Sequence, residues 1–256
     1  MNPMALPPRL WTTDAAAVPA LLREQGFVAL PPATLAAVAQ RPLVALDALK
    51  DSWNRLPPDR WLRDGGSYRH RRHDSYVVTT GADAGLRLVQ HRAHWQPVEY
   101  NALHGGIERW FAPLQAAMAD HPAWRQLLCA LAARSATLRG LSAAEPCYVE
   151  AHPFRIDTTD GIGRPTPEGA HRDGVDLVVV ILVARQGIKG GETRVFDARG
   201  PQGLRFTLTE PWSALLLDDA RVIHESTPIQ PIDTAAGGHR DTLVLTFRQG
   251  GFQGPA

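Results

Sequence analysis

The sequence predicts a mainly β protein with α-helical additions. A double-stranded β-helix (a jelly roll) over residues 145–250 is expected to pack against a mainly helical N-terminal part over residues 1–140. In the C-terminal part, roughly seven or eight strand-like runs follow one another with short turns and no helix between them, as in antiparallel sandwiches. In the N-terminal part, apolar residues recur at the spacing of amphipathic helices. We therefore expect residues 1–256 to form a single domain whose barrel has one open mouth.

The N-terminal part begins with a short predicted helix that ends at Gly26, because glycine suits the left-handed residue that follows a helix. The apolar run at residues 27–30 then reads as a strand closed by two prolines. Helical spacing returns over residues 33–53 and again over residues 105–138. Between them, residues 54–104 carry loop signals and no clear element.

The C-terminal part is predicted to consist of strands. Each run is rich in β-branched residues or alternates apolar with polar residues, and turn residues separate the runs. The predicted strands cover Cys147–Ile156, Leu177–Val183, Glu192–Phe196, Leu204–Leu208, Trp212–Leu217, Val222–Ile229 and Thr242–Phe247.

The composition narrows the possible functions. The chain has 256 residues, 44% of them hydrophobic, and a net charge of +1, so nothing argues for nucleic acid or an acidic membrane as a partner. Its two cysteines, Cys129 and Cys147, form no C-x-x-C pair and suit buried free thiols in a reducing cytoplasm. No apolar run of about 20 residues and no secretory signal is present, so we expect a cytoplasmic protein. The oligomeric state cannot be read from the sequence.

The most informative residues are His171, Asp173 and His224. On an extended segment, residues two apart point the same way, so His171 and Asp173 can hold one ion together. His224 follows the next predicted strand, and two imidazoles with one carboxylate can occupy one face of a non-haem Fe(II). The alternative interpretation is a surface polar pair and a hydrogen-bonded core histidine. We interpret Asp218 and Asp219, just before His224, as groups that orient the strand or a ligand imidazole, not as catalytic acids.

A 2-oxo acid that chelates such an iron needs a cation for its far carboxylate. Arg240 begins the last predicted strand, and a guanidinium meets a carboxylate through two parallel hydrogen bonds. A salt bridge to Asp241 is the alternative role for Arg240, and Arg248 at the other end of the strand is the alternative anchor. We prefer Arg240.

A short basic run over residues 69–73 is expected to be a solvated patch, because the positive charge does not extend along the chain. The alternative is that one of its side chains faces an anionic substrate. Several histidines lie in and after this run, and no two of them have a spacing that places both on one element, so we expect none to bind metal. They are His70, His73, His91, His94 and His104.

Several segments together resemble the bacterial 2-oxoglutarate/Fe(II)-dependent dioxygenases that include L-isoleucine 4-hydroxylase. The resemblance covers residues 68–248 and is strongest in the last 80 or so residues of that range. The segments that carry it are Pro-Glu-Gly-Ala-His171-Arg-Asp173-Gly-Val-Asp, Gly190-Gly-Glu-Thr, Leu-Leu-Leu-Asp-Asp219 with His224, His-Arg240-Asp-Thr-Leu-Val-Leu-Thr-Phe, and Tyr100-Asn-Ala-Leu-His-Gly-Gly-Ile-Glu-Arg-Trp-Phe.

The resemblance implies a double-stranded β-helix, Fe(II) held by His171, Asp173 and His224, and 2-oxoglutarate and O2 as co-substrates. It also implies a small-molecule substrate, in particular a free L-amino acid, with succinate and CO2 as co-products. Arg155 is the candidate for pairing with a substrate carboxylate, and a structural salt bridge is its alternative role. Because His152 and Arg155 alternate on one predicted strand, only one of them can point into the barrel.

Two other classes of function compete with this one. A cupin-like jelly-roll metalloprotein without oxidase activity would bind metal and have no use for Arg240. An inactive scaffold would keep only the fold. Within the dioxygenases, the substrate could also be a larger natural product or a peptide. Consumption of 2-oxoglutarate separates the first two classes from the dioxygenase.

Overall fold

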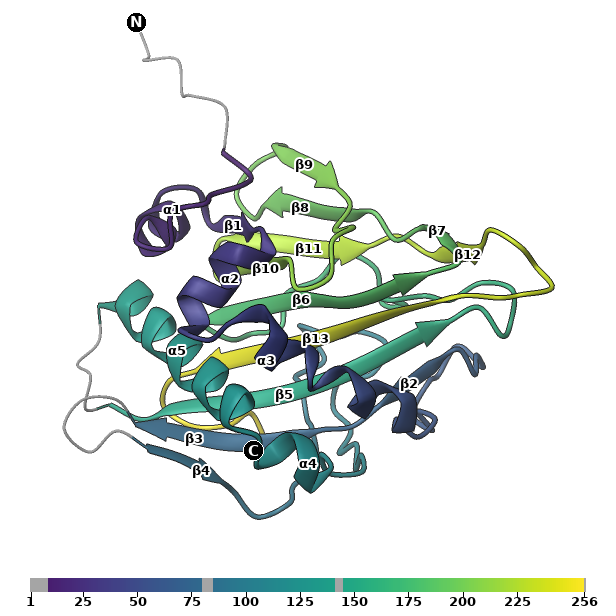
Figure 1. The fold of residues 1–256 in the computed structure, drawn as a ribbon, viewed down its shortest axis with the longest axis horizontal. Coiled ribbons are helices and arrows are strands. Elements are labelled where there is room, and N and C mark those ends of the chain that lie inside the picture. Colours follow the sequence, from purple (N-terminus) through teal and green to yellow (C-terminus); the bar gives the residue numbers. More distant parts are fainter. Residues whose placement is uncertain (1–8, 80–84, 141–144, 256) are drawn as a thin grey trace, which may run out of the picture.

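The computed structural model describes residues 9–79, 85–140 and 145–255, and it shows a mainly β architecture (Figure 1). Residues 1–8 and Ala256, at the ends of the predicted domain, lie outside the described ranges. Strands from both halves of the chain join one large antiparallel sheet, in the order β1-β10-β6-β13-β5-β3-β4, with β2 also pairing with β5. Its strands are β1 (Phe27–Leu30), β2 (Arg69–Arg71), β3 (Asp74–Thr79), β4 (Gly85–Leu88), β5 (Cys147–Asp157), β6 (Leu177–Gln186), β10 (Ala214–Asp218) and β13 (His239–Arg248).

Two smaller antiparallel sheets complete the β structure. One has the order β11-β8-β9, and the other pairs β12 with β7. The predicted strand at residues 222–229 is therefore two strands in two sheets. The elements are β7 (Ile188–Gly190), β8 (Thr193–Asp197), β9 (Gly203–Phe206), β11 (Val222–Ser226) and β12 (Ile229–Pro231).

The helices lie along one face of the large sheet, as Figure 1 shows for α2, α3 and α5. The longest, α5, begins at Pro122, and the His121 ring accepts a hydrogen bond from the Ala123 N–H at 3.2 Å, as expected for a cap. The helical elements are α1 (Val18–Gln25), α2 (Pro32–Ala39), α3 (Leu43–Asp47), the 3₁₀ helix η1 (Lys50–Arg55), α4 (Ala116–Ala119) and α5 (Pro122–Arg139). None of the helices in the three described ranges is both long and apolar enough to cross a lipid bilayer.

The predicted helix before α4 is wrong. Residues 107–115 are extended, and His94 and Arg109 exchange two backbone hydrogen bonds of 3.0 Å, so this segment pairs with a distant one instead of with itself. Trp110, one of the apolar residues at helical spacing in this stretch, is 53% exposed. With β1–β4 added to the large sheet, the N-terminal part is less helical than predicted.

Apolar cores cover both faces of the large sheet. On one face, helix residues such as Trp124 and Leu127 pack against Val179 and Leu245. On the other, large-sheet side chains including Val178 and Leu215 pack against the small sheet through Val195 and Val222. Burial on both faces explains why β6 is a continuous apolar run and not an alternating one.

Candidate metal centre and its cavity

The backbone brings His171 and His224 together. His171 lies in the loop between β5 and β6, and His224 lies on β11. The N–H of each residue donates to the carbonyl of the other at 3.0 Å, as in a short antiparallel bridge. Their ring centroids are consequently 4.6 Å apart.

A buried carboxylate shapes the loop that carries Asp173. Asp219, at the end of β10, accepts hydrogen bonds from the backbone N–H groups of Asp173 (3.0 Å), Gly174 (2.7 Å) and Val175 (3.1 Å). Its role matches the sequence interpretation of Asp219 as an orienting group. Gly174 has a φ of +74°, and a Cβ there would lie 2.5 Å from the Tyr100 ring, so only glycine fits this turn.

His171, Asp173 and His224 converge, each offering one ligand atom within 4.8 Å of the others. Asp173 Oδ1 is 3.9 Å from His171 Nε2, and Asp173 Oδ2 is 3.8 Å from His224 Nε2. The Nδ1 of His171 lies 2.9 Å from the Gly169 carbonyl, which can only accept, so Nδ1 carries the proton and Nε2 keeps its lone pair for a ligand. Two imidazole nitrogens and one carboxylate fit Fe(II).

The electrostatics of the three residues favour a cation between them. Burial and the neighbouring His171 lower the pKa of His224 to about 3, so its ring is neutral. Burial would also lower the pKa of His171, but the carboxylates of Asp173 and Glu168 outweigh it and raise that pKa. A divalent ion bound between these side chains would replace the proton that the two carboxylates favour on His171, and both imidazoles would then be neutral.

The Arg240 side chain lines the same cavity as His171, Asp173 and His224. It is 3% exposed, and its Nε and one Nη have no hydrogen-bond partner. It forms no salt bridge to any described carboxylate, and burial together with Arg185 lowers its pKa to about 10. Arg185, opposite it on β6, is occupied by the Gly190 carbonyl at 2.7 Å. A buried guanidinium without an acid is costly unless an anion binds it.

The basic run is not a solvated patch. Arg69, Arg71 and His73 are 4%, 3% and 0% exposed. Alternation along β2 turns Arg69 and Arg71 inward, and both line the cavity. The Arg69 Nε pairs with buried Asp59 at 2.7 Å. The alternative that a side chain of this run faces the ligand cavity is the one that agrees with the structure.

Arg71 has no carboxylate partner among the described residues. Its guanidinium carbon lies 3.8 Å from the Phe111 ring centroid and 4.3 Å from that of Phe154, so it is sandwiched between two aromatic faces. One Nη lies 2.6 Å from His152 Nδ1, and Nε has no partner. Burial lowers the pKa of Arg71.

A second buried arginine is tied to the metal centre through a glutamine. Arg109 Nη2 donates to Gln96 Oε1 at 2.8 Å, and Gln96 Nε2 donates to Asp173 Oδ1 at 2.9 Å. Arg109 keeps an unpartnered Nε, and burial lowers its pKa to about 10. On the same cavity wall, Glu168 has one carboxylate oxygen 3.6 Å from His171 Nε2 and the other buried without a partner.

Two arginines named from the sequence lie away from the cavity. Arg155 is directly opposite Asp241 in the β5–β13 pairing, and its Nε and Nη2 each contact that carboxylate at 2.7 Å. The salt-bridge alternative therefore describes Arg155, and its partner on the alternating strand, His152, is the one that lines the cavity. Arg248 donates to the Gly251 carbonyl and does not line the cavity.

The sequence reasoning missed Gln96, Arg109 and Glu168. Gln96 lies on a segment without periodicity, and Arg109 lies in the segment that helical spacing wrongly assigned to a helix, so no local pattern placed either side chain at a site. Glu168 is three residues before His171, and its place in the same loop was the one available signal.

The comparisons with known proteins agree with this geometry. A family model described as 2OG-Fe dioxygenase matches residues 50–246. No curated protein sequence matches the chain. Among solved structures, a BsmA homologue from Methylobium petroleophilum PM1 is 56% identical over 98% of both chains, with a TM-score of 0.90.

More distant structures share the fold. IDO from Bacillus thuringiensis is 15% identical over 97% of this chain and 99% of its own, with a TM-score of 0.74. The Fe(II)/α-ketoglutarate-dependent dioxygenase TqaL is 18% identical over 92% of this chain and 86% of its own, with a TM-score of 0.68.

Proposed function

We propose a function within the 2OG-Fe dioxygenase family, to which this chain belongs: it hydroxylates a free L-amino acid and releases succinate and CO2. Family membership makes the chain a 2-oxoglutarate-dependent dioxygenase that uses Fe(II), 2-oxoglutarate and O2. The amino acid substrate, the likeness to L-isoleucine 4-hydroxylase and the single double-stranded β-helix domain are our proposals. The observation that carries the substrate proposal is a pair of buried arginines, Arg71 and Arg240, that face the cavity without a described carboxylate partner.

The proposed iron ligands are His171, Asp173 and His224. With 2-oxoglutarate and O2, iron bound there supplies the oxidising power that adds one oxygen atom to an unactivated carbon. The protein orients the ligands: Gly169 fixes the His171 ring, Gln96 holds one oxygen of Asp173, and Asp219 holds its backbone.

The proposed anchor for the far carboxylate of 2-oxoglutarate is Arg240. Support comes from its burial, its unpartnered Nε and Nη2, and the pairing of the adjacent Asp241 with Arg155, which leaves Arg240 free for a ligand. A carboxylate that accepts two hydrogen bonds from this guanidinium would offset its buried charge.

The proposed partner of the substrate carboxylate is Arg71, assisted by Arg109. Arg71 lies on β2 and Arg240 on β13, with β5 between them, so the two receptors are separate. The buried, unpartnered oxygen of Glu168 suits the substrate ammonium group. An α-amino acid carries both charges on one carbon, and Arg71, Arg109 and Glu168 all line the one cavity that would hold it.

The wall of the cavity also keeps water from the reacting carbon. Phe154, Ile156, Val180 and Val244 line it, and they come from strands β5, β6 and β13 of the large sheet. These four are most of the apolar residues in a lining of mainly polar residues, and apolar side chains beside the reacting carbon would limit uncoupled turnover of 2-oxoglutarate.

The decisive experiment measures succinate from 2-oxoglutarate with Fe(II), ascorbate and O2 across the standard L-amino acids. We expect succinate to rise with one amino acid or a small set of them, together with a product heavier by one oxygen. Succinate formed at a low rate regardless of the amino acid would contradict the amino acid proposal and point to a larger natural-product or peptide substrate. Absence of succinate from iron-loaded protein would contradict the proposed assignment of the iron and 2-oxoglutarate sites.

A further inference from the structure

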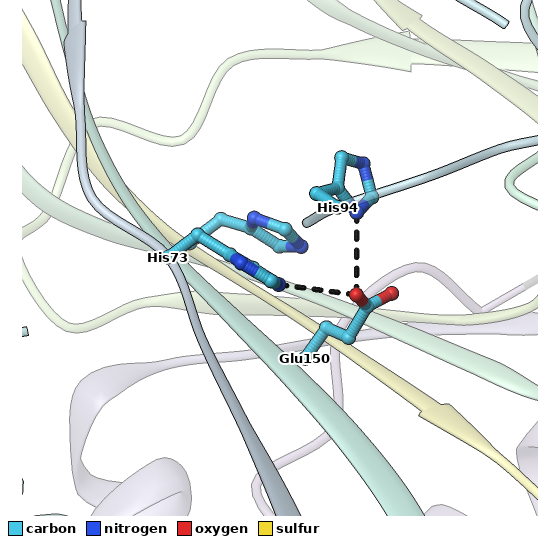
Figure 2. A group of neighbouring side chains, drawn as sticks. His73, His94 and Glu150 are labelled. Carbon is cyan, nitrogen blue, oxygen red and sulfur yellow. Dashed lines mark hydrogen bonds and ion pairs between the residues drawn. The ribbon is translucent and has the colours of Figure 1, made fainter. Parts of the chain in front are cut away.

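A second group of metal-ligand side chains lies outside the proposed iron centre. His73 follows β2, His94 lies on the extended segment after β4, and Glu150 and His152 lie on β5. Figure 2 shows His73 and His94 reaching the Glu150 carboxylate from two separate segments. The ligand atoms of the four residues all lie within 4.8 Å of one another.

We propose that His73, His94 and Glu150 form a second metal site, which takes a divalent transition-metal ion such as Zn²⁺. This site is distinct from His171, Asp173 and His224, and its assignment does not depend on the substrate or on the activity of the enzyme.

The distances within the group fit a shared ion. Two atoms that each lie about 2.1 Å from one metal are separated by about 3.0 Å at a right angle and about 3.4 Å at a tetrahedral angle. Glu150 Oε1 is 3.0 Å from His73 Nε2 and 3.4 Å from His94 Nδ1. Two imidazoles and one carboxylate are ligands that zinc and related ions accept.

The protonation states also fit. Burial lowers the pKa of His73, and it lowers that of His94 to about 3, so both rings are neutral. Without an ion, the nitrogen of each ring that faces the Glu150 carboxylate carries the proton, because an ionised carboxylate can only accept. A bound ion would shift that proton to the other ring nitrogen, which in His73 has no hydrogen-bond partner. Burial alone would raise the pKa of Glu150, but His94 and His73 beside it hold that pKa well below its usual range. A metal ion needs neutral imidazoles and an ionised carboxylate, and both are present before it arrives.

His152 is excluded from the ligand set by its neighbour. Arg71 Nη2 lies 2.6 Å from His152 Nδ1, and a guanidinium can only donate, so Nδ1 accepts and the ring proton is on Nε2. A neutral imidazole in that form has no lone pair left for an ion. His152 instead stacks on His73 with ring centroids 4.8 Å apart and forms a wall of the site.

The surroundings orient the ligands and leave a route for the ion. Arg92 Nη1 lies 3.2 Å from Glu150 Oε1, and Ser75 Oγ lies 3.4 Å from His73 Nε2. Arg92 is a neighbour of the kind that fixes a ligand carboxylate, whereas Ser75 contacts the proposed ligand nitrogen itself and would give way to the ion. His94 lines the main cavity, so the buried group is reachable from it. Three imidazoles and a carboxylate in a core cost more to bury than apolar side chains of equal size, which argues that they serve a ligand.

The test starts from a variant without the proposed iron ligands, His171→Ala with His224→Ala. This variant is loaded with Zn²⁺ and desalted, and its metal content is measured by mass spectrometry. We expect about one zinc per chain in it and about two in the unaltered protein. Adding Glu150→Gln, or separately His73→Gln, should remove the remaining zinc.

Two matched controls sharpen the result. His152→Phe should keep the zinc, because His152 is not a ligand. His91→Gln should also keep it, because His91 lies on the same segment as His94 but at 38% side-chain exposure, outside the group. Thermal unfolding confirms that each variant is folded. If the Glu150 and His73 variants do not fold, Co²⁺ loading of the starting variant replaces them, and ligand-field absorption bands of a nitrogen-coordinated ion are expected.

Three results would overturn the proposal. The starting variant could hold no zinc after desalting and show no Co²⁺ bands, which would make the group a hydrogen-bonded cluster around Glu150. Zinc that survives both Glu150→Gln and His73→Gln would be bound elsewhere. Loss of zinc in His152→Phe as well as in Glu150→Gln would mean that His152 is a ligand and that the three-residue site is wrong.

Discussion

Two regions of this molecule use the same ligand chemistry in different surroundings. His171, Asp173 and His224 gather at the cavity on a loop and a short strand, with ligand atoms 3.8 and 3.9 Å apart. His73, His94 and Glu150 lie in the core, with ligand atoms 3.0 and 3.4 Å apart. The first group lines the cavity, and Gln96 joins it to Arg109 on the cavity wall. The second is bordered by Arg92 and His152 and meets the cavity at His94.

The number of ligands does not separate the two groups, because each offers two imidazoles and one carboxylate. What differs is the charge and bonding of the side chains around them. His171, Asp173 and His224 share their cavity with Arg240, which has no acid partner among the described residues, whereas the Arg92 guanidinium beside the second group already donates to Glu150. We infer that the first region carries the reaction, and that the second supports the wall from which Arg71 and His152 reach the cavity.

Removing one proposed iron ligand should abolish the function of the first region and leave the metal content of the second region unchanged. His224→Ala is expected to lower succinate production by more than about 100-fold, since loss of groups that merely orient a metal ligand already costs about 10–100-fold. The zinc of the core group should be unchanged in the same protein. Parallel assays of succinate and metal content check both statements. Normal turnover in this variant would refute the assignment of His224.

Arg240→Ala tests the proposed anchor for the far carboxylate of 2-oxoglutarate. A charge-assisted pair of hydrogen bonds contributes about 1.5–3 kcal/mol, so the KM for 2-oxoglutarate should rise by about 10–100-fold while iron binding persists. Arg248→Ala is the matched control on the same strand, and its KM should not change. The anchor would have to be moved to Arg248 if only the second variant shows the rise.

The sequence was most informative where the spacing of two residues alone decides which way their side chains point. His171 and Asp173 were named together because they lie two residues apart on an extended segment. The structure brings them to His224 through a backbone bridge between His171 and His224, which lies on the strand that follows Asp219. The strand runs of the C-terminal part were found because β-branched and alternating residues are local signals. Of the pair on β5, alternation showed that only one of His152 and Arg155 could face inward, and the register with β13 decided which.

The failures share one physical cause. The basic run was taken as solvated because isolated charges usually are, although Arg69, Arg71 and His73 have the same two-residue spacing that was trusted for His171 and Asp173. Burial of charges depends on partners such as Asp59, 10 residues from Arg69, and Glu150, 77 residues from His73, and no local pattern marks either pair. The predicted helix before residue 116 failed for the same reason, because pairing with His94 overrides helical spacing.

Arg71→Met is expected to weaken binding of the amino acid substrate and to raise the free energy of unfolding. Removing a guanidinium that has no acid partner relieves a buried charge, and replacement of buried charges by apolar side chains is often neutral or stabilising by about 1–4 kcal/mol. The KM for the amino acid substrate should rise by about 10-fold or more, as for loss of one charged hydrogen bond, with the KM for 2-oxoglutarate unchanged. Steady-state kinetics in both substrates and thermal unfolding measure the three quantities. A rise in the KM for 2-oxoglutarate instead would assign Arg71 to the co-substrate.

Arg155→Gln is the counterpart on the outer face of the same sheet, and it should have the smallest effect on catalysis. Arg155 pairs with Asp241, which is 3% exposed, so its loss leaves a buried carboxylate with only His239 nearby, at 3.6 Å. The free energy of unfolding should fall by about 1–3 kcal/mol, the cost of a buried acceptor that loses a partner. Both KM values should stay within twofold of the unaltered protein, because the side chain does not reach the cavity. The two variants, on paired strands, should therefore change the free energy of unfolding in opposite directions. Arg71 has no acid partner, so its buried charge lowers stability while it serves substrate binding. Arg155 is paired with Asp241, so it raises stability and takes no part in binding. Equal destabilisation by both variants would show that Arg71 has an acid partner in solution, and the case for it as a ligand receptor would be lost.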